Sequence, residues 1–355
     1  MNQEIKINNM DLNNKAAVFT VCNVAYLDKV MVLAESLFNS NSIKINVFLF
    51  DKKREVFLPD DFWNIHWIEE LDIPDFKILS FKYNIIELST ALKPWLALKL
   101  LESNSKVVFF DPDVMVFNSI DSIISNLDEH PVIITPHYFH PKYNGLSDDA
   151  KIMRFGSYNL GFFAVNSSVD SKTFLSWWSE RLMLNCFDDA QFGIFTDQKW
   201  VTTAQCFFPF IHVSYNPGLN VAYWNIDERV ITKNENQKYI VNKDFPLIFF
   251  HFSSFNSKFP EKLSKNFTIG DNTSSIISNL AIDYNNQLKK YNNISKDLTY
   301  SFDYMSNGKY ISPTLRRAYA SVFELFHKEH DPFDSKGAVA NFAKKNYLFE
   351  KNNKK

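Results

Sequence analysis

The first half of the chain alternates between short apolar runs and stretches in which apolar residues recur at helical spacing. Residues 16–21 and 45–50 are nearly unbroken apolar runs, and residues 65–68 form a third candidate strand. Between the first two runs, apolar residues recur at i, i+3, i+4 and i+7 from Val30 to Leu37, which favours an amphipathic helix. Because unbroken runs are typical of strands buried on both faces, the pattern predicts a β-α-β unit in a parallel sheet.

A second helix leads into a strand that ends in two acidic residues. The pattern from Thr90 to Leu101 predicts a helix with Thr90 as its cap and Pro94 in its first turn, because proline lacks the backbone N–H that later turns need. An apolar strand follows and runs into Asp111 and Asp113. This alternation favours an α/β fold with a Rossmann-like sheet, in which ligands bind at the carboxyl ends of the strands.

The pattern changes in the last quarter of the chain. Residues 264–309 are rich in Ser, Asn and Lys, and their periodicity is weaker. We therefore divide the chain into an α/β domain at residues 1–265 and a mainly helical extension at residues 266–355. The extension ends in a basic tail from Lys344 to Lys355.

One helix of this extension is strongly amphipathic and is expected from Thr314 to about His330. Its apolar face comprises Leu315, Ala318, Tyr319, Val322, Phe323 and Phe326, and its other face carries Arg316, Arg317, Glu324, Lys328 and Glu329. Mixed charges suit docking on the same domain or on a second copy of the chain, since a helix at a membrane surface is mainly basic on its polar face. The alternative is docking to a membrane or a partner protein, which the basic tail would favour on anionic lipid.

The composition excludes several functional classes. Of the 355 residues, 46% are hydrophobic and 22% are charged, as in ordinary globular proteins. The 38 basic and 40 acidic residues nearly cancel, which argues against binding to nucleic acid. The three cysteines lack C-x-x-C spacing and fit a reducing compartment. The chain starts without an apolar leader, so we expect a cytoplasmic protein.

Asp111 and Asp113 are the sharpest chemical signal. Two carboxylates one residue apart on a strand-end turn are suitable ligands for Mg²⁺ or Mn²⁺, and such an ion would neutralise a diphosphate. The alternative is a solvated turn that uses Asp and Pro for its backbone conformation. Apolar runs on both sides favour the metal, because few structural turns need two acids between buried strands.

Two further segments place polar side chains in apolar surroundings. Asn159 and Gly161 suggest an amide offered to a ligand where the backbone must come close, and the alternative is a bulge in a core strand. Asp197 and Gln198 are expected to contact sugar hydroxyls. The alternative for that segment is an N-terminal helix cap formed by Thr196 or Asp197.

The last two candidates lie further along the chain. Residues 216–225 are dense in amide and aromatic side chains, which suit a carbohydrate with apolar faces and hydroxyl edges. A buried loop satisfied by its own Asn side chains is the alternative. His251 stands inside an apolar strand, where a lone histidine is more often a core residue, although neutral imidazole is a good Mn²⁺ ligand.

Together, in this order, the segments resemble GT-A glycosyltransferases, the nucleotide-sugar-dependent enzymes with one Rossmann-like domain. The order is similar to that of glycosyltransferase family 8, and more closely to that of transferases from bacterial polysaccharide gene clusters. The shared segments are residues 92–95, 110–114, 159–162, 174–178, 196–201, 220–225 and 251–253. The resemblance covers about residues 16–265 and implies a GT-A fold with a C-terminal helical extension. It implies nucleotide-sugar binding in about residues 16–117, and donor and acceptor sugar contacts in about residues 118–265.

The resemblance also implies a role for each matching residue. Asp111, Asp113 and His251 would hold Mn²⁺ or Mg²⁺, and Asp111 would also contact the nucleotide. Asn159, Asp197 and Gln198 would read the donor sugar, with Gln198 near its anomeric carbon and Asp197 and Gln198 as the catalytic pair. The nucleotide, expected to be UDP, would be held by Thr20, Cys22, Asn23 and Tyr26, with Lys93 and Lys258 at the diphosphate.

The function expected on this basis is a metal-dependent, retaining hexosyltransferase of surface polysaccharide biosynthesis. Its partners would be a UDP-sugar and a glycan, lipid-linked glycan or glycoprotein acceptor, with no nucleic acid. A homodimer and peripheral contact with the inner face of the membrane are further hypotheses. If the reaction inverts instead, Asp188, Asp189 and Asp197 are the candidate bases. The alternatives are a catalytically inactive sugar-binding or scaffold protein, and a phosphohydrolase in which Asp111 attacks phosphorus and Asp113 is the acid.

Overall fold

A mostly parallel sheet of seven strands forms the centre of the computed structural model, which describes residues 16–56, 62–142, 149–265, 275–295, 298–326 and 331–349. The strand order is β10-β6-β7-β4-β1-β2-β3. The strands are β1 (Ala17–Cys22), β2 (Ile45–Leu49), β3 (Trp63–Trp67), β4 (Lys106–Phe110), β6 (Val132–Pro136), β7 (Tyr158–Asn166) and β10 (Ile211–Val213). β7 runs antiparallel to both of its neighbours, and the other strands share one direction. The expected α/β, Rossmann-like fold is confirmed.

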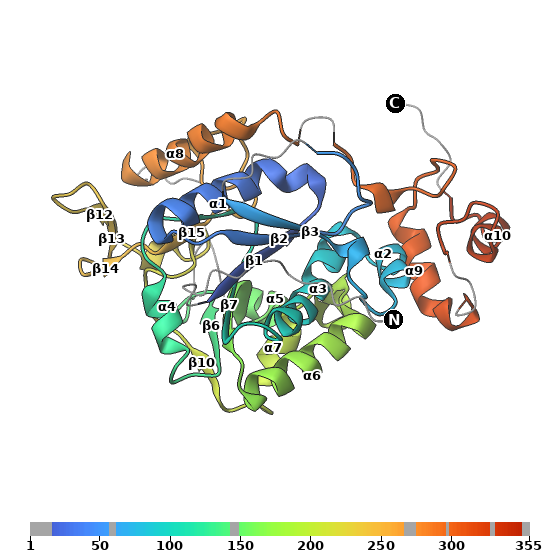
Figure 1. The fold of residues 1–355 in the computed structure, drawn as a ribbon, viewed down its shortest axis with the longest axis horizontal. Coiled ribbons are helices and arrows are strands. Elements are labelled where there is room, and N and C mark those ends of the chain that lie inside the picture. Colours follow the sequence, from blue (N-terminus) through green and yellow to red (C-terminus); the bar gives the residue numbers. More distant parts are fainter. Residues whose placement is uncertain are drawn as a thin grey trace.

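Helices cover both faces of this sheet (Figure 1). α1 (Leu27–Asn41) packs on one face, while α3 (Ile85–Leu100) and α6 (Val169–Asn185) pack together on the other. Successive residues of β1 point alternately into the two cores, because side chains in a strand alternate between faces. Phe19 and Val21 enter the core beneath α3 and α6, and Val18 and Cys22 enter the core beneath α1. The unbroken apolar runs therefore reflect burial on both faces.

The helix expected from Thr90 begins earlier, so two expectations about it were wrong. The Asn84 side chain accepts hydrogen bonds from the N–H groups of Ile86 and Glu87, and the Glu87 carboxylate accepts one from the Asn84 N–H. Asn84 and Glu87 thus form a capping box, in which the side chain of each residue accepts the backbone N–H of the other. A lone Thr can supply only one of these two contacts. Thr90 therefore lies within the helix, where its hydroxyl donates to the carbonyls of Ile86 and Glu87. Pro94 lies in the helix interior.

Within the described residues, three small sheets and further helices surround the central sheet. The small sheets have the orders β11-β15-β5, β12-β13-β14 and β8-β9. Their strands are β5 (Val114–Val116), β8 (Asp188–Asp189), β9 (Ile194–Phe195), β11 (Val221–Ala222), β12 (Ile231–Lys233), β13 (Tyr239–Val241), β14 (Phe245–Pro246) and β15 (Phe249–His251). The remaining helices are α2 (Phe76–Lys82), α4 (Asp121–Asn126), α5 (Asp149–Phe155), α7 (Gln198–Ala204), α8 (Ser275–Tyr291), α9 (Pro313–Val322) and α10 (Ala338–Lys345).

The C-terminal helices share cores with the rest of the molecule. α8 lies along α1 on the side away from the sheet (Figure 1), and its Tyr284 ring stacks on Phe252 with centroids 3.8 Å apart. α9 packs on α2, and its buried Leu315 and Tyr319 join the core beneath α3 and α6. The amphipathic helix therefore docks on its own chain, as expected. The division at residue 265 stays a prediction, although both of these cores cross it.

Arg316 was expected on the polar face of the amphipathic helix and is buried instead. Only 2% of its surface is exposed. One guanidinium nitrogen donates to the carbonyls of Ser80, Phe81 and Tyr83 at the end of α2, and the other donates to Phe302. A helix leaves its last carbonyls without partners, and this guanidinium supplies donors to those at the end of α2. α9 ends at Val322, before the expected end at His330, which lies outside the described residues.

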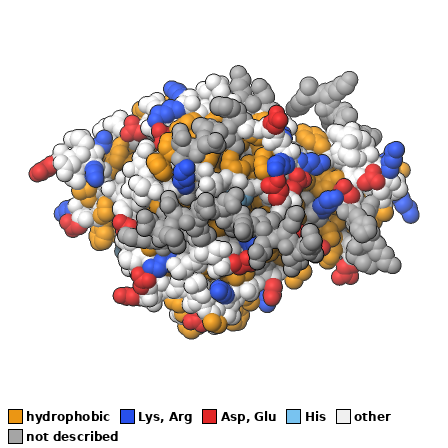
Figure 2. Space-filling model, in the orientation of Figure 1, with side chains coloured by type: hydrophobic (Ala, Val, Ile, Leu, Met, Phe, Trp, Pro, Cys, Tyr) orange, Lys and Arg blue, Asp and Glu red, His pale blue; other side chains and the backbone are white. Residues whose placement is uncertain are grey.

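The visible surface carries charges of both signs. Figure 2 shows basic and acidic side chains interspersed over this face, in keeping with the near-zero net charge. Across the described segments, no helix combines the length and hydrophobicity that crossing a membrane requires. Lys354 and Lys355 of the expected basic tail lie outside the described residues.

Candidate functional site

Three strands bring the acidic pair and the late histidine together. Asp111 follows the carboxyl end of β4, and its N–H donates to the Gly161 carbonyl at 2.8 Å. Asp113 precedes β5, which pairs antiparallel with β15 so that Val114 lies opposite His251. Asp111 and Asp113 lie on the turn between β4 and β5, and His251 ends β15, the partner strand of β5, so more than 130 residues of intervening chain close on one point.

The geometry of this cluster fits a divalent cation. One ligand atom from each of Asp111, Asp113 and His251 lies within 4.8 Å of the others. His251 Nε2 is 3.1 Å from an Asp113 oxygen and 3.8 Å from an Asp111 oxygen. An octahedral ion with bonds of about 2.1 Å holds adjacent ligands about 3 Å apart. Two carboxylates and one imidazole form a donor set that suits Mn²⁺ or Mg²⁺.

Opposing effects act on the ionisation of these groups. Burial favours the neutral form of Asp113, but the neighbouring His251 outweighs it and holds the pKa of that carboxyl well below its usual range. Burial raises the pKa of Asp111, and Lys93 offsets this only in part. Burial alone would lower the pKa of His251, yet the two carboxylates reverse the effect and raise it. Such coupled shifts are typical of functional sites.

Lys93 forms a buried link between two of the candidate acids. Only 3% of its side chain is exposed, on the inner side of α3. Its ammonium group lies 3.1 Å from Asp111 and 3.0 Å from Asp197, and it donates to the Leu160 carbonyl at 2.9 Å. The ammonium group therefore has a partner for each of its three hydrogens. Its contact with a diphosphate stays a prediction.

Asp197 and Gln198 lie where α7 begins, next to Asn159 of β7. The Asp197 side chain is buried and does not cap α7, so the helix-cap alternative is wrong for this residue. Gln198 accepts a hydrogen bond from the Asn159 amide at 3.2 Å and donates to the Phe155 carbonyl at 3.2 Å. The structure thus brings three of the sugar-reading candidates together, one of them joined to the metal candidates through Lys93.

The last residues of β1 and those just after it lie at the same edge of the sheet. Thr20, Cys22 and Asn23 are buried, and Tyr26 is 40% exposed. The Asn23 side chain accepts from the Ala25 N–H at 2.7 Å, while burial raises the pKa of the Cys22 thiol and keeps it protonated. The expected contacts of these residues with a nucleotide stay predictions.

Lys258 is the last of the candidate nucleotide-binding residues. It is exposed on the loop after β15, and its backbone N–H donates to the Asn256 side chain. Its expected contact with the diphosphate also stays a prediction.

Sequence reasoning missed His137, which lies beside Asn159. Its Nε2 is 3.5 Å from the Asn159 amide nitrogen, and its ring meets Trp224 edge to face. Burial lowers the pKa of His137 to about 4, so its imidazole is neutral at physiological pH. The signal was present, because His137 follows an apolar run, residues 132–135, that was not recognised as strand β6.

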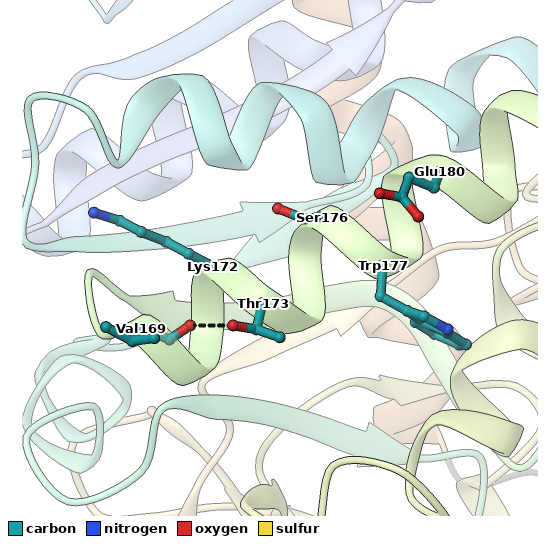
Figure 3. A pocket seen from close by; sticks show the side chains of 6 residues that line it. All are labelled: Val169, Lys172, Thr173, Ser176, Trp177 and Glu180. Atoms are coloured by element: carbon teal, nitrogen blue, oxygen red, sulfur yellow. Dashed lines mark hydrogen bonds between the residues drawn. The ribbon is translucent and has the colours of Figure 1, made fainter.

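A shallow pocket elsewhere on the molecule has none of these features. It has a volume of about 470 Å³ and is lined only by residues of α6. Figure 3 shows its six lining side chains, with the Thr173 hydroxyl donating to the Val169 carbonyl one turn earlier. None of the candidate site residues lines this pocket.

Comparisons with known proteins identify the family of the chain. A family model described as nucleotide-diphospho-sugar transferase matches residues 63–245, a little over half of the chain. The uncharacterized protein YfnF of Bacillus subtilis is 25% identical over 46% of this chain and 55% of its own length. YfnD of the same organism is 23% identical over 66% of this chain and 76% of its own length. This chain thus spans about half of the first relative.

Solved structures with a similar arrangement are more distant in sequence. A galactosyltransferase, LgtC, solved with donor and acceptor sugar analogues, is 15% identical at a TM-score of 0.49, over 78% of this chain and 95% of its own. The glycosyltransferase GlyE of Streptococcus pneumoniae is 14% identical at a TM-score of 0.44, over 82% of this chain and 67% of its own.

Proposed function

Because the chain belongs to the nucleotide-diphospho-sugar transferase family, we propose that it is a metal-dependent glycosyltransferase that uses a UDP-sugar. It moves a hexose with retention of configuration to a glycan, lipid-linked glycan or glycoprotein acceptor in surface polysaccharide biosynthesis. The observation that carries the proposal is the cluster of Asp111, Asp113 and His251 at the carboxyl edge of the sheet. Ligands of such sheets bind at this edge.

In this proposal, Asp111, Asp113 and His251 hold Mn²⁺ or Mg²⁺. The bound cation supplies charge neutralisation for the nucleoside diphosphate that leaves. Lys93 bridges Asp111 and Asp197 and holds both in place, because its ammonium group lies within 3.1 Å of both carboxylates. Its charge also offsets the repulsion between the partly exposed Asp111 carboxylate and the buried Asp197 carboxylate.

The donor sugar is read by the side chains next to the metal cluster. The Asp197 carboxylate and the Gln198 amide oxygen stabilise positive charge that develops at the anomeric carbon. Asn159 and the Phe155 carbonyl hold the Gln198 amide by hydrogen bonds at both ends, which orients it before a sugar binds. Preorganised dipoles of this kind cost little reorganisation during the reaction.

The first prediction concerns Asp111 and Asp113. Asp111→Asn and Asp113→Asn should each lower UDP release from UDP-sugars with Mn²⁺ by roughly 100-fold or more, because a bound cation contributes several kcal/mol of charge stabilisation. Both variants should stay folded, since both residues lie on a turn at the sheet edge and are partly exposed. Asp170→Asn, at an exposed position in the first turn of α6, is the matched control.

The same assay separates the alternatives. Equal turnover with Mn²⁺ and with excess chelator would contradict metal dependence. UDP-sugar binding without nucleotide release, across a screen of sugars and acceptors, would favour the inactive sugar-binding protein. Metal-independent phosphate release from a phosphomonoester, lost in Asp111→Asn, would favour the phosphohydrolase.

A further inference from the structure

The second ring nitrogen of His251 faces an amide, away from the acidic pair. His251 is 4% exposed, and its Nε2 points to Asp113 and Asp111. Its Nδ1 lies 3.3 Å from the side-chain oxygen of Asn220. A histidine ligand needs a lone pair on the nitrogen that faces the metal, and the bond made by the other nitrogen sets which one carries the proton.

The orientation of the Asn220 amide can be assigned from a neighbouring group that can act only as a hydrogen-bond donor. The Gly161 N–H can only donate, and it donates to the Asn159 side-chain oxygen at 3.1 Å. That oxygen, at 3.0 Å from Asn220, must therefore face the Asn220 amide nitrogen. The same nitrogen donates to the Thr135 hydroxyl at 2.9 Å. The Asn220 oxygen is left facing His251, and an amide oxygen only accepts, so His251 Nδ1 must be the donor.

The backbone holds Asn220 where this contact requires it. Its φ is +49°, in the left-handed region that Asn tolerates better than most residues. Its carbonyl accepts a hydrogen bond from the Asn225 side chain at 3.1 Å. Asn220 is 1% exposed, and its amide makes its hydrogen bonds to buried groups of the protein. This favours the buried-loop alternative for residue 220 of the amide-rich segment.

The His251 ring itself has little freedom to turn. A Cβ on Gly161 would lie 2.4 Å from His251 Cε1, so only glycine lets the ring lie against β7. The Trp224 ring meets it edge to face, with centroids 5.2 Å apart. A ring held on two sides cannot easily exchange its two nitrogens between Asn220 and the acidic pair.

We propose that Asn220 is a positioning residue that holds His251 in the tautomer protonated at Nδ1 and so presents the Nε2 lone pair to the cation. This rests on the proposed function, because the cation is the one that Asp111 and Asp113 would bind. The same amide also donates to Asn159, which holds Gln198. The amide chain thereby joins the metal ligand to the residues proposed to read the sugar.

The test uses the full chain and Mn²⁺ alone as the probe. Asn220→Leu keeps a side chain of similar size but removes the acceptor, and should weaken Mn²⁺ binding by roughly 10–100-fold in calorimetry. Asn220→Asp keeps an acceptor for His251 and should restore most of that affinity. Thr135→Val removes one acceptor of the Asn220 amide nitrogen without touching His251, and should bind Mn²⁺ as the unmodified chain does.

A spectroscopic readout tests the tautomer directly. In metal-free protein with ¹⁵N-labelled histidine, at a pH alkaline enough to make the imidazole neutral, His251 should show a protonated Nδ1 and an unprotonated Nε2. His251→Gln identifies the signal by its loss. In Asn220→Leu the signal should move toward a mixture of tautomers. Thr135→Val should leave it unchanged.

Failure of this inference and failure of the proposed function give different results. If Mn²⁺ does not bind the unmodified chain, the proposed metal site fails, yet the tautomer spectrum still decides the role of Asn220. A protonated Nε2 in the unmodified chain would overturn the inference, even if Asn220→Leu fails to fold. So would unchanged Mn²⁺ affinity and an unchanged tautomer in folded Asn220→Leu.

Discussion

His137 is kept neutral by burial, and this makes the stability of the protein depend on pH. Its pKa is about 4 in the folded chain and about 6.5 when unfolded. Between these values the unfolded state binds the extra proton, so stability falls as pH falls through this window. A difference of about 2.5 units corresponds to about 3 kcal/mol, as an order of magnitude.

The prediction is that the free energy of unfolding drops by this order between about pH 6.5 and pH 4 more steeply in the unmodified chain than in His137→Asn. Urea unfolding across this pH range measures it. His140→Gln is the control for replacing a histidine, because the His140 side chain is 77% exposed. Parallel curves for the unmodified chain and His137→Asn would show that His137 does not cause the loss.

At the same scale, residue chemistry was easier to predict than residue surroundings. Asp111 and Asp113 could be recognised because apolar runs flank them and their spacing suits a cation. His251 could not be separated from a core histidine by sequence alone, because the difference lies in Asp113, Asn220 and a glycine from β7, all distant in the sequence. Lys93 likewise gave no sign that its partners include Asp197.

Elements that follow from local patterns were predicted, and elements that depend on distant partners were not. β1, β2 and β4 are nearly unbroken apolar runs that the sequence marks clearly. β11, only two residues long, has no periodic signal, yet with β5 and β15 it builds the sheet that carries His251 to Asp113. Pairing across such distances is set by tertiary packing, which overrides local propensity.

A buried guanidinium links α9 to the end of α2, which leads to a prediction for Arg316. Arg316→Ala should lower the free energy of unfolding by roughly 3–5 kcal/mol, because it leaves Asp303 and four backbone carbonyls without this donor. Thermal unfolding followed by circular dichroism measures the effect. Lys345→Ala, at an exposed position in the last turn of α10, should leave the melting temperature unchanged.

The outcome that would count against this account is specific. If Arg316→Ala has the same melting temperature as the unmodified chain, the apolar residues of α9 alone hold the helix in place. Arg316→Lys separates charge from geometry, because a lysine ammonium is a point donor and cannot span the carbonyls that the planar fork reaches. We expect Arg316→Lys to keep only part of the stability that Arg316→Ala loses.

For the whole molecule, the main question is whether the C-terminal helices are part of the folded unit. Leu315 and Tyr319 of α9, together with Val339 and Ala343 of α10, lie in the same core as the sheet residues beneath α3 and α6. Arg317 donates to both oxygens of the buried Glu87 carboxylate, and one of these oxygens also accepts from the Asn84 N–H. Removing these helices therefore exposes apolar surface and leaves a buried carboxylate without its cation.

Truncation after Pro313 tests this directly. Each large apolar side chain that is buried contributes about 1.5–3 kcal/mol. The loss of Leu315, Tyr319 and Val339 from the core is therefore comparable to the stability margin of a typical domain, about 5–15 kcal/mol. We expect the truncated chain to aggregate or to melt at a much lower temperature, measured by thermal unfolding and size-exclusion chromatography. Leu325→Ser, at a position that is 74% exposed beyond α9, is the control and should not change the melting temperature.

If the truncated chain keeps its melting temperature and its activity on a soluble acceptor, but no longer floats with anionic liposomes, these helices serve membrane docking instead. That result would contradict the packing account, because helices that merely dock elsewhere contribute nothing to the stability of the sheet they leave.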